Sequence, residues 1–149
     1  MSGSDGNAVP CAIDWVLDSL RNNTALMSLL NEDQTRIQLL PHDISVQYPA
    51  IGLSVIPLDD KCTIEGTIVL SYILVSVMGI CEGTDISPIV PISSVMHSIL
   101  QNMFNTSNPV RDLGTIYSCD RVGPVYYSRK DKMDVTWQYL GGQYRIAVQ

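Results

Sequence analysis

The longest apolar segment of the chain, residues 67–80, most constrains what this sequence can fold into. As a β-strand it is apolar on both faces, because alternate residues of a strand point to opposite sides. One face carries Ile68, Leu70, Tyr72, Leu74, Met78 and Ile80, and the other carries Val69, Ile73, Val75 and Val77. We therefore expect a helix to cover one face and another layer or subunit to cover the other. The segment is too short, and with Ser71 and Ser76 too polar, for a membrane-spanning helix of about 20 apolar residues.

Two amphipathic helices are predicted from apolar residues that recur every three or four positions. The first helix follows Pro10, and the second, which has the clearest pattern of the chain, covers residues 92–103. Their apolar positions are Ile13, Val16, Leu17 and Leu20 in the first, and Ile92, Val95, Met96, Ile99, Leu100 and Met103 in the second. Thr24 is expected to cap a short helical turn after the first helix.

Shorter apolar segments predict further strands at residues 35–40, 50–56 and 115–127, the last with a break at Gly123 and Pro124. Pro57 is expected to end the second of these strands and to leave Asp59 and Asp60 in a polar turn. The mixed order of helices and strands predicts an α+β fold. In this fold the N-terminal helix and the long helix pack on one mostly antiparallel sheet.

The apolar residues of the last segment change parity at Gly141-Gly142. Before the glycines they stand at odd positions and after them at even ones: Val135, Trp137, Tyr139, Tyr144, Ile146 and Val148. A two-residue turn at the glycines would pair Tyr139 with Tyr144 and place all six on one face. A glycine bulge in one longer strand would also change the parity. We favour the hairpin.

The length of 149 residues fits one compact domain. We expect residues 1–9 to form a flexible N-terminus and residues 10–149 to form the domain. A hydrophobic content of 46% excludes global disorder. The charged content is only 16%, against about 25% in typical domains. Part of the surface is therefore expected to contact other subunits.

The charge of the chain is negative overall and unevenly distributed. The formal net charge of −6 argues against a free nucleic-acid binder or a binder of anionic membranes. Residues 1–100 hold 11 acidic and 3 basic residues, whereas residues 101–149 hold 4 and 6. A head-to-tail assembly would use this asymmetry. Arg129, Lys130 and Lys132 form a basic cluster and are the candidate contact with a partner, although a plain solvated loop is the alternative.

The sequence shows no pattern typical of a catalytic or metal site. The four cysteines stand far apart without a Cys-x-x-Cys pair, so we expect them in the core. His42, in a link, and His97, on the polar side of the long helix, have no nucleophile motif nearby. Asp59, Asp60 and Glu65 do not fit a calcium-binding loop. We therefore expect no enzymatic activity, no cofactor and no metal.

Two further features bear on partners and on location. Trp137 and the tyrosines at positions 126, 127, 139 and 144 have rings of the kind that stack on nucleic-acid bases in some proteins, but core or interface aromatics are the simpler interpretation.

Residues 1–7 lack the basic and apolar regions of a signal peptide, so we expect synthesis and folding in the cytoplasm.

Several segments, taken in order, resemble one protein family. They are the first helix followed by residues 26–30, Pro49-Ala50-Ile51-Gly52-Leu53, the long strand through Tyr72, Val75 and Val77, the helix at 92–103, and Gly142-Gln143-Tyr144-Arg145-Ile146. Over about residues 10–149, this order resembles the tail terminator, or tail completion, family of long-tailed bacteriophages.

The resemblance implies a structural virion protein of the tail and neck that is assembled in the host cytoplasm. In that family a homo-hexameric ring caps the tail-tube protein, stops tube polymerisation and joins the tail to the head-closure (stopper) protein, while DNA passes through the lumen unread. No catalytic residue follows from it. Another neck component, such as a stopper or tube-like protein, is the nearest alternative. A small cytosolic enzyme or ligand-binding module is the alternative from another class, and its sign would be a cleft with convergent polar groups.

Overall fold

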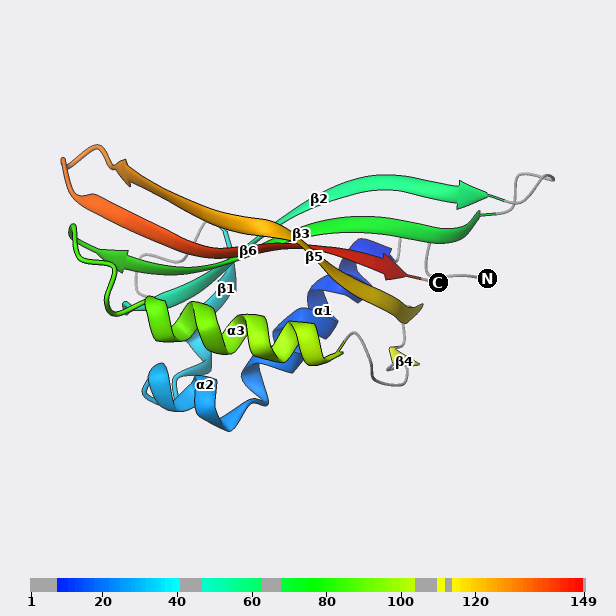
Figure 1. Ribbon diagram of the computed structural model, residues 1–149, viewed down its shortest axis with the longest axis horizontal. Coiled ribbons are helices and arrows are strands. Elements are labelled where there is room, and N and C mark those ends of the chain that lie inside the picture. The colour runs from blue at the N-terminus through cyan, green and yellow to red at the C-terminus, as the bar shows by residue number, and fades with distance from the viewer. Residues whose placement is uncertain (1–7, 41–46, 63–67, 104–109, 112–113, 149) are drawn as a thin grey trace.

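The computed structural model describes residues 8–40, 47–62, 68–103, 110–111 and 114–148 of the chain (Figure 1). Its elements are helices α1 (Ala8–Arg21), α2 (Thr24–Leu29) and α3 (Val90–Met103), a 3-10 turn (Gln34–Arg36), and strands β1 (Ile37–Leu39), β2 (Ala50–Cys62), β3 (Ile68–Glu82), β4 (Val110–Arg111), β5 (Gly114–Lys130) and β6 (Thr136–Val148). The predicted long strand and both predicted amphipathic helices are therefore confirmed.

The strands form a mixed, mostly antiparallel sheet in the order β1-β2-β3-β6-β5, which the two-residue β4 extends beside the start of β5. Strand β1 runs parallel to β2, and the other neighbouring strands are antiparallel. The helices lie on one side of the sheet (Figure 1). The α+β fold, with an N-terminal helix and the long helix packed on the sheet, is thus as predicted.

The core lies between the helices and the face of the sheet that they cover. Its largest fully buried side chains include Trp15, Leu20, Ile92, Met96 and Leu100 from the helices. The sheet contributes Ile73, Val75, Val77, Tyr144 and Ile146 to the same cluster. Three of the four cysteines, Cys11, Cys81 and Cys119, are buried, as expected.

Two local predictions around α2 and β2 were wrong. The cap of α2 is Asn23, whose side-chain oxygen accepts a hydrogen bond from the Leu26 backbone N–H at 2.9 Å, and Thr24 is already helical. Pro57 does not end β2, because a register shift after it restores the pairing with β3. Asp59 and Asp60 therefore belong to the strand, and the β2–β3 hairpin extends past the helices at one end of the sheet (Figure 1).

The predicted hairpin at Gly141-Gly142 was also wrong. β6 continues through both glycines and pairs with β3 in one unbroken register, from Glu82 opposite Trp137 to Ser71 opposite Val148. A Cβ atom on residue 141 would collide with the backbone carbonyl oxygen of Val77. Gly141 is therefore required by the close approach of β3, not by a turn. The bulges of this half of the sheet lie on β5, at Ile116/Ser118 and Arg121/Gly123.

The unbroken strand separates the apolar residues that a hairpin would have placed on one face. Tyr144, Ile146 and Val148 point into the core beneath the helices. Trp137 and Tyr139, at odd positions, lie on the opposite face. Within the described part of the chain, no helix or second layer covers that opposite face (Figure 1).

The close approach at Gly141 predicts a strong and local effect of a single methyl group. We expect Gly141→Ala to lower the free energy of unfolding by about 1 to 3 kcal/mol, because the added Cβ must displace the β3 backbone. Gly123→Ala is the matched control, since a Cβ there meets no atom within 4 Å. Urea denaturation of both variants measures the difference. Equal stability of the two would refute the continuous β3–β6 pairing at this position.

The packing of α3 predicts a second pair of effects on stability. Leu100 has no exposed surface and belongs to the core, so Leu100→Ala should cost about 2 to 5 kcal/mol of unfolding free energy. Val90, at the start of the same helix, is 46% exposed, and Val90→Ala should change the stability by about 0.5 kcal/mol or less. Chemical denaturation compares the two. A loss at position 90 as large as that at position 100 would contradict the face assigned to α3.

Candidate functional site

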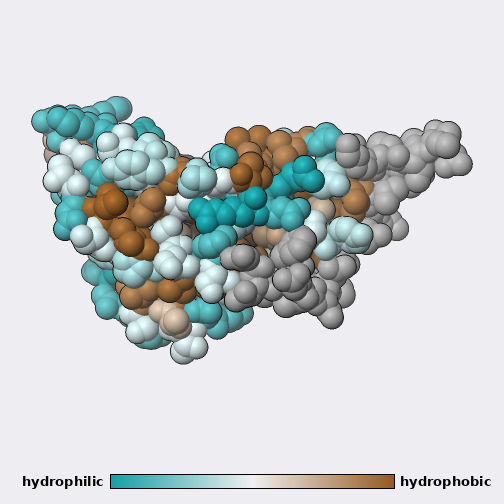
Figure 2. All heavy atoms as spheres, viewed as in Figure 1, coloured by the Kyte–Doolittle hydropathy of each residue, from teal (hydrophilic) through white to brown (hydrophobic). Residues whose placement is uncertain are grey.

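An aromatic groove lies on the uncovered face of the sheet, near the β5–β6 turn. It has a volume of about 490 Å³ and is lined by Leu40, Tyr48, Ile80, Tyr127, Arg129, Asp131, Trp137 and Tyr139. Figure 2 shows a hollow in the outline of the molecule on the side away from the helices, with hydrophobic and hydrophilic residues side by side on the visible surface. We call the eight lining residues together the aromatic groove.

Two aromatic pairs form the groove. The rings of Tyr127 and Tyr139, which are opposite each other on β5 and β6, stack with their centroids 4.5 Å apart at 13°. The rings of Tyr48 and Trp137 lie 4.7 Å apart at 53°. Both distances are typical of favourable aromatic pairs. Burial raises the pKa of the Tyr48 and Tyr127 hydroxyls, so both stay neutral near pH 7.

Asp131 fixes the turn that ends the groove. Its Oδ1 accepts hydrogen bonds from the backbone N–H groups of Met133 and Val135, at 2.8 and 3.0 Å. Its Oδ2 accepts from the indole Nε1 of Trp137 at 3.0 Å. These bonds, with that from Trp137 the largest cause, lower the pKa of the Asp131 carboxyl. The carboxylate is therefore engaged in holding the turn and the indole ring.

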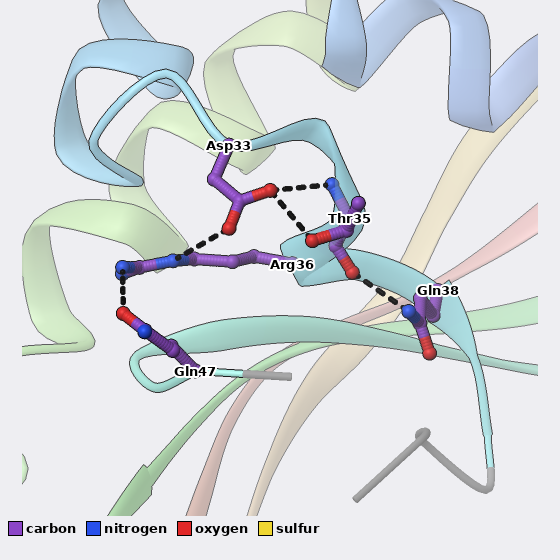
Figure 3. A network of polar contacts seen from close by, with 5 residues as sticks. All are labelled: Asp33, Thr35, Arg36, Gln38 and Gln47. Carbon is purple, nitrogen blue, oxygen red and sulfur yellow. Dashed lines mark hydrogen bonds and ion pairs between the residues drawn. The ribbon is translucent and has the colours of Figure 1, made fainter. Parts of the chain in front are cut away.

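A second polar network anchors the segment that brings Leu40 and Tyr48 to the groove (Figure 3). Asp33 caps the 3-10 turn, since its Oδ1 accepts from the Thr35 backbone N–H at 3.0 Å. The buried Arg36 lies 3.7 Å from the Asp33 carboxylate and donates from Nη2 to Gln47 Oε1 at 3.1 Å. Arg36 thereby links Asp33, before β1, to Gln47, at the end of the β1–β2 connection.

The predicted basic cluster is divided by the structure. Arg129 lines the groove and makes no ion pair with any residue that the structure describes. Lys130 is 3.5 Å from the Asp134 carboxylate on the exposed turn, and Lys132 is exposed outside the groove. Arg129 is therefore the member of the cluster that the structure places among the aromatic residues.

Other residues considered from the sequence lie away from the groove. His97 is half-buried on the helix side, where its Nδ1 is 3.1 Å from the Tyr144 hydroxyl. Burial raises the pKa of the Cys119 thiol to about 12, which leaves it a poor nucleophile near pH 7. His42 and Glu65 lie outside the described residues. Among the residues that the structure does describe, no three His, Cys, Asp or Glu side chains gather as metal ligands would.

The composition of the groove suits binding of an extended segment more than a reaction. Its walls are aromatic and aliphatic, its one carboxylate is engaged in the turn, and Arg129 supplies a positive charge at the edge. Such surfaces take apolar or proline-containing segments, and the arginine favours an acidic residue next to them. Its polar groups are the hydroxyls of Tyr48, Tyr127 and Tyr139, the Arg129 guanidinium and the Asp131 carboxylate.

No protein-family model matches the chain, and no curated protein matches its sequence. None of the described helices is long and apolar enough to cross a membrane.

The bonds of Asp131 predict a pH-dependent contribution to stability. The folded-state pKa lies below the ordinary value of 3.8, so the stabilisation is fully present above that value and is lost as the pH falls through the lowered pKa. Asp131→Asn should therefore unfold at a lower temperature than the wild type at pH 7, and the difference should shrink below pH 3.8. Thermal unfolding followed by circular dichroism measures it. Asp134→Asn, on the same turn, is the control, and a pH-independent difference for Asp131→Asn would contradict this role.

Proposed function

We propose that the chain is the subunit of a bacteriophage tail terminator. In this proposal six copies form a ring that caps the tail tube, stops its polymerisation and joins the tail to the head-closure protein, with DNA passing through the lumen. The observation that carries the proposal is the uncovered face of the sheet with its exposed apolar residues. A subunit with such a face is suited to permanent contact with other chains.

The uncovered face exposes apolar side chains at several positions. Ile56 is 52% and Leu58 is 45% exposed on β2, and Tyr127 is 37% exposed in the groove. On β3 and β6, Tyr72 lies beneath the Arg145 guanidinium, 4.6 Å from the ring centroid. Exposed apolar patches rimmed by polar groups mark interaction surfaces. A β3 strand that is apolar on both faces requires such a partner.

The edges of the sheet also support assembly. On β5, only Gly114 and Thr115 pair with β4, and no described strand borders the outer edge from Ile116 to Lys130. On the other side, the short β1 borders β2 only from Ile51 to Leu53. Long unpaired edges and their exposed apolar residues are normally covered in soluble proteins. Since the two edges belong to opposite sides of one subunit, a head-to-tail contact would use both, and such contacts close into rings.

The charge of the chain is compatible with the proposed channel. A net charge of −6 disfavours adhesion of DNA that must slide through a ring.

Electron microscopy of particles assembled without this chain tests the proposal. We expect overlong tail tubes without heads, beside filled heads without tails, because nothing would stop the tube or join it to the neck. Supplying the wild-type chain from a plasmid should restore finished virions and is the control.

Two other results would contradict the proposal. Tubes of normal length beside unattached heads would assign the chain to another neck component, such as the stopper. Normal virions would exclude a neck function altogether and would favour a ligand-binding role.

A further inference from the structure

Two exposed features of the sheet carry side chains of complementary chemistry. The first is the aromatic groove with Arg129 at its edge. The second is Ile56-Pro57-Leu58-Asp59 on β2, four consecutive exposed residues that we call the β2 arm. Both apolar members of the arm have about half of their surface exposed. The arm starts in the middle of β2, where Ile56 pairs with Leu74, and the groove lies towards the β5–β6 turn.

The chemistry of the arm fits the groove. Grooves lined by aromatic rings bind the apolar side chains of extended segments. The β2 arm is extended and exposes the aliphatic side chains of Ile56 and Leu58, whereas Pro57, opposite Ile73 of the core, points to the other face. An acidic residue, Asp59, follows directly, and the groove places the Arg129 guanidinium beside its aromatic rings. Asp59 and Arg129 therefore carry opposite charges, and the carboxylate of the groove itself, Asp131, is engaged in the turn.

The arm cannot enter the groove of its own molecule. Ile56 pairs with Leu74 on β3, whereas Ile80, six residues further along the same strand, lines the groove. At about 3.3 Å per residue, these positions are about 20 Å apart along a rigid strand. An occupant of the groove with the chemistry of the arm must therefore come from another copy.

We propose that the β2 arm of one copy docks in the aromatic groove of the next copy, with its aliphatic residues on the aromatic pairs and Asp59 facing Arg129. Groove and arm are different surfaces of one subunit, so two copies can exchange arms reciprocally, whereas in a ring the arm of each copy enters the groove of the next. Its use in a hexameric ring rests on the proposed function, whereas the contact itself rests on the two surfaces.

Photo-crosslinking tests the contact directly. Benzoylphenylalanine replaces Tyr127 in the full chain, and equal amounts of ¹⁵N-labelled and unlabelled protein are mixed and irradiated at high concentration. We expect peptides that join position 127 of one copy to residues 54–62 of another, in labelled–unlabelled pairs. The same probe at Val90, exposed on α3 outside the groove, is the control and should not reach those residues. Crosslinks to other regions only, or to no second copy, would overturn the contact.

Charge reversal tests the predicted pair of side chains. Arg129→Glu should weaken self-association by about tenfold or more, and adding Asp59→Arg to the same chain should restore most of it. Lys132→Glu makes the same charge change outside the groove and should have little effect. Circular dichroism verifies that each variant folds, and the crosslinking result stands independently of these variants. An equal effect of Lys132→Glu, or failure of the second substitution to restore association, would contradict the pairing.

The two proposals fail in different ways. Crosslinks between arm and groove in a chain whose removal leaves tail tubes and heads normal would keep the contact and reject the tail terminator. Overlong tubes without crosslinks between copies would keep the tail terminator and reject the contact. Crosslinks from position 127 to a different virion protein would assign the groove to that protein and would also reject the contact between copies.

Discussion

The unbroken ladder between β3 and β6 decides which side chains reach each face of the sheet. It pairs twelve consecutive residues of each strand without a register shift. Because side chains alternate, a slip of one residue would exchange the buried and the open faces. Gly141 makes this ladder possible, since no larger residue fits against the Val77 carbonyl. The helix-side core and the open aromatic face both depend on this one close approach.

The aromatic groove follows from this register with help from two polar networks. The ladder sets Tyr139 opposite Ile80 and beside Tyr127, so the sheet supplies the floor of the groove. The Asp131 carboxylate holds the indole of Trp137, and the Asp33–Arg36–Gln47 network fixes the connection that carries Tyr48. The two networks come from segments about a hundred residues apart. A rigid site on an otherwise open face is the result.

The sequence was sufficient for the elements whose pattern is local. Helix α3 was predictable because its apolar residues recur with the helical period, and β3 because its apolar residues fill both faces of a strand too short for a membrane. The parity change at Gly141-Gly142 could not distinguish a hairpin turn from a continuous strand, because a tight turn and the close approach of a neighbouring strand both require glycine. Only the register with β3 distinguishes them.

The candidate site was predictable only in part, for the same reason. Arg129 was noticed from its charge, and it does line the groove. Trp137 and Tyr139 were placed on the wrong face by the predicted hairpin. The contact between Tyr48 and Trp137 joins residues far apart in the chain, and no local pattern near Tyr48 indicates it. Pro57 was read as the end of a strand, although a bulge lets β2 continue and form the arm.

Iodide quenching of tryptophan fluorescence tests most directly whether the groove is covered in the assembled protein. The chain has two tryptophans, and Trp15 is fully buried in the core, so iodide reports on Trp137 in the groove. We predict that iodide quenches Trp137 in dispersed subunits and that this quenching is largely lost on assembly. Equal quenching in dispersed and assembled protein would show that the groove stays open, and would contradict its role as the contact between subunits.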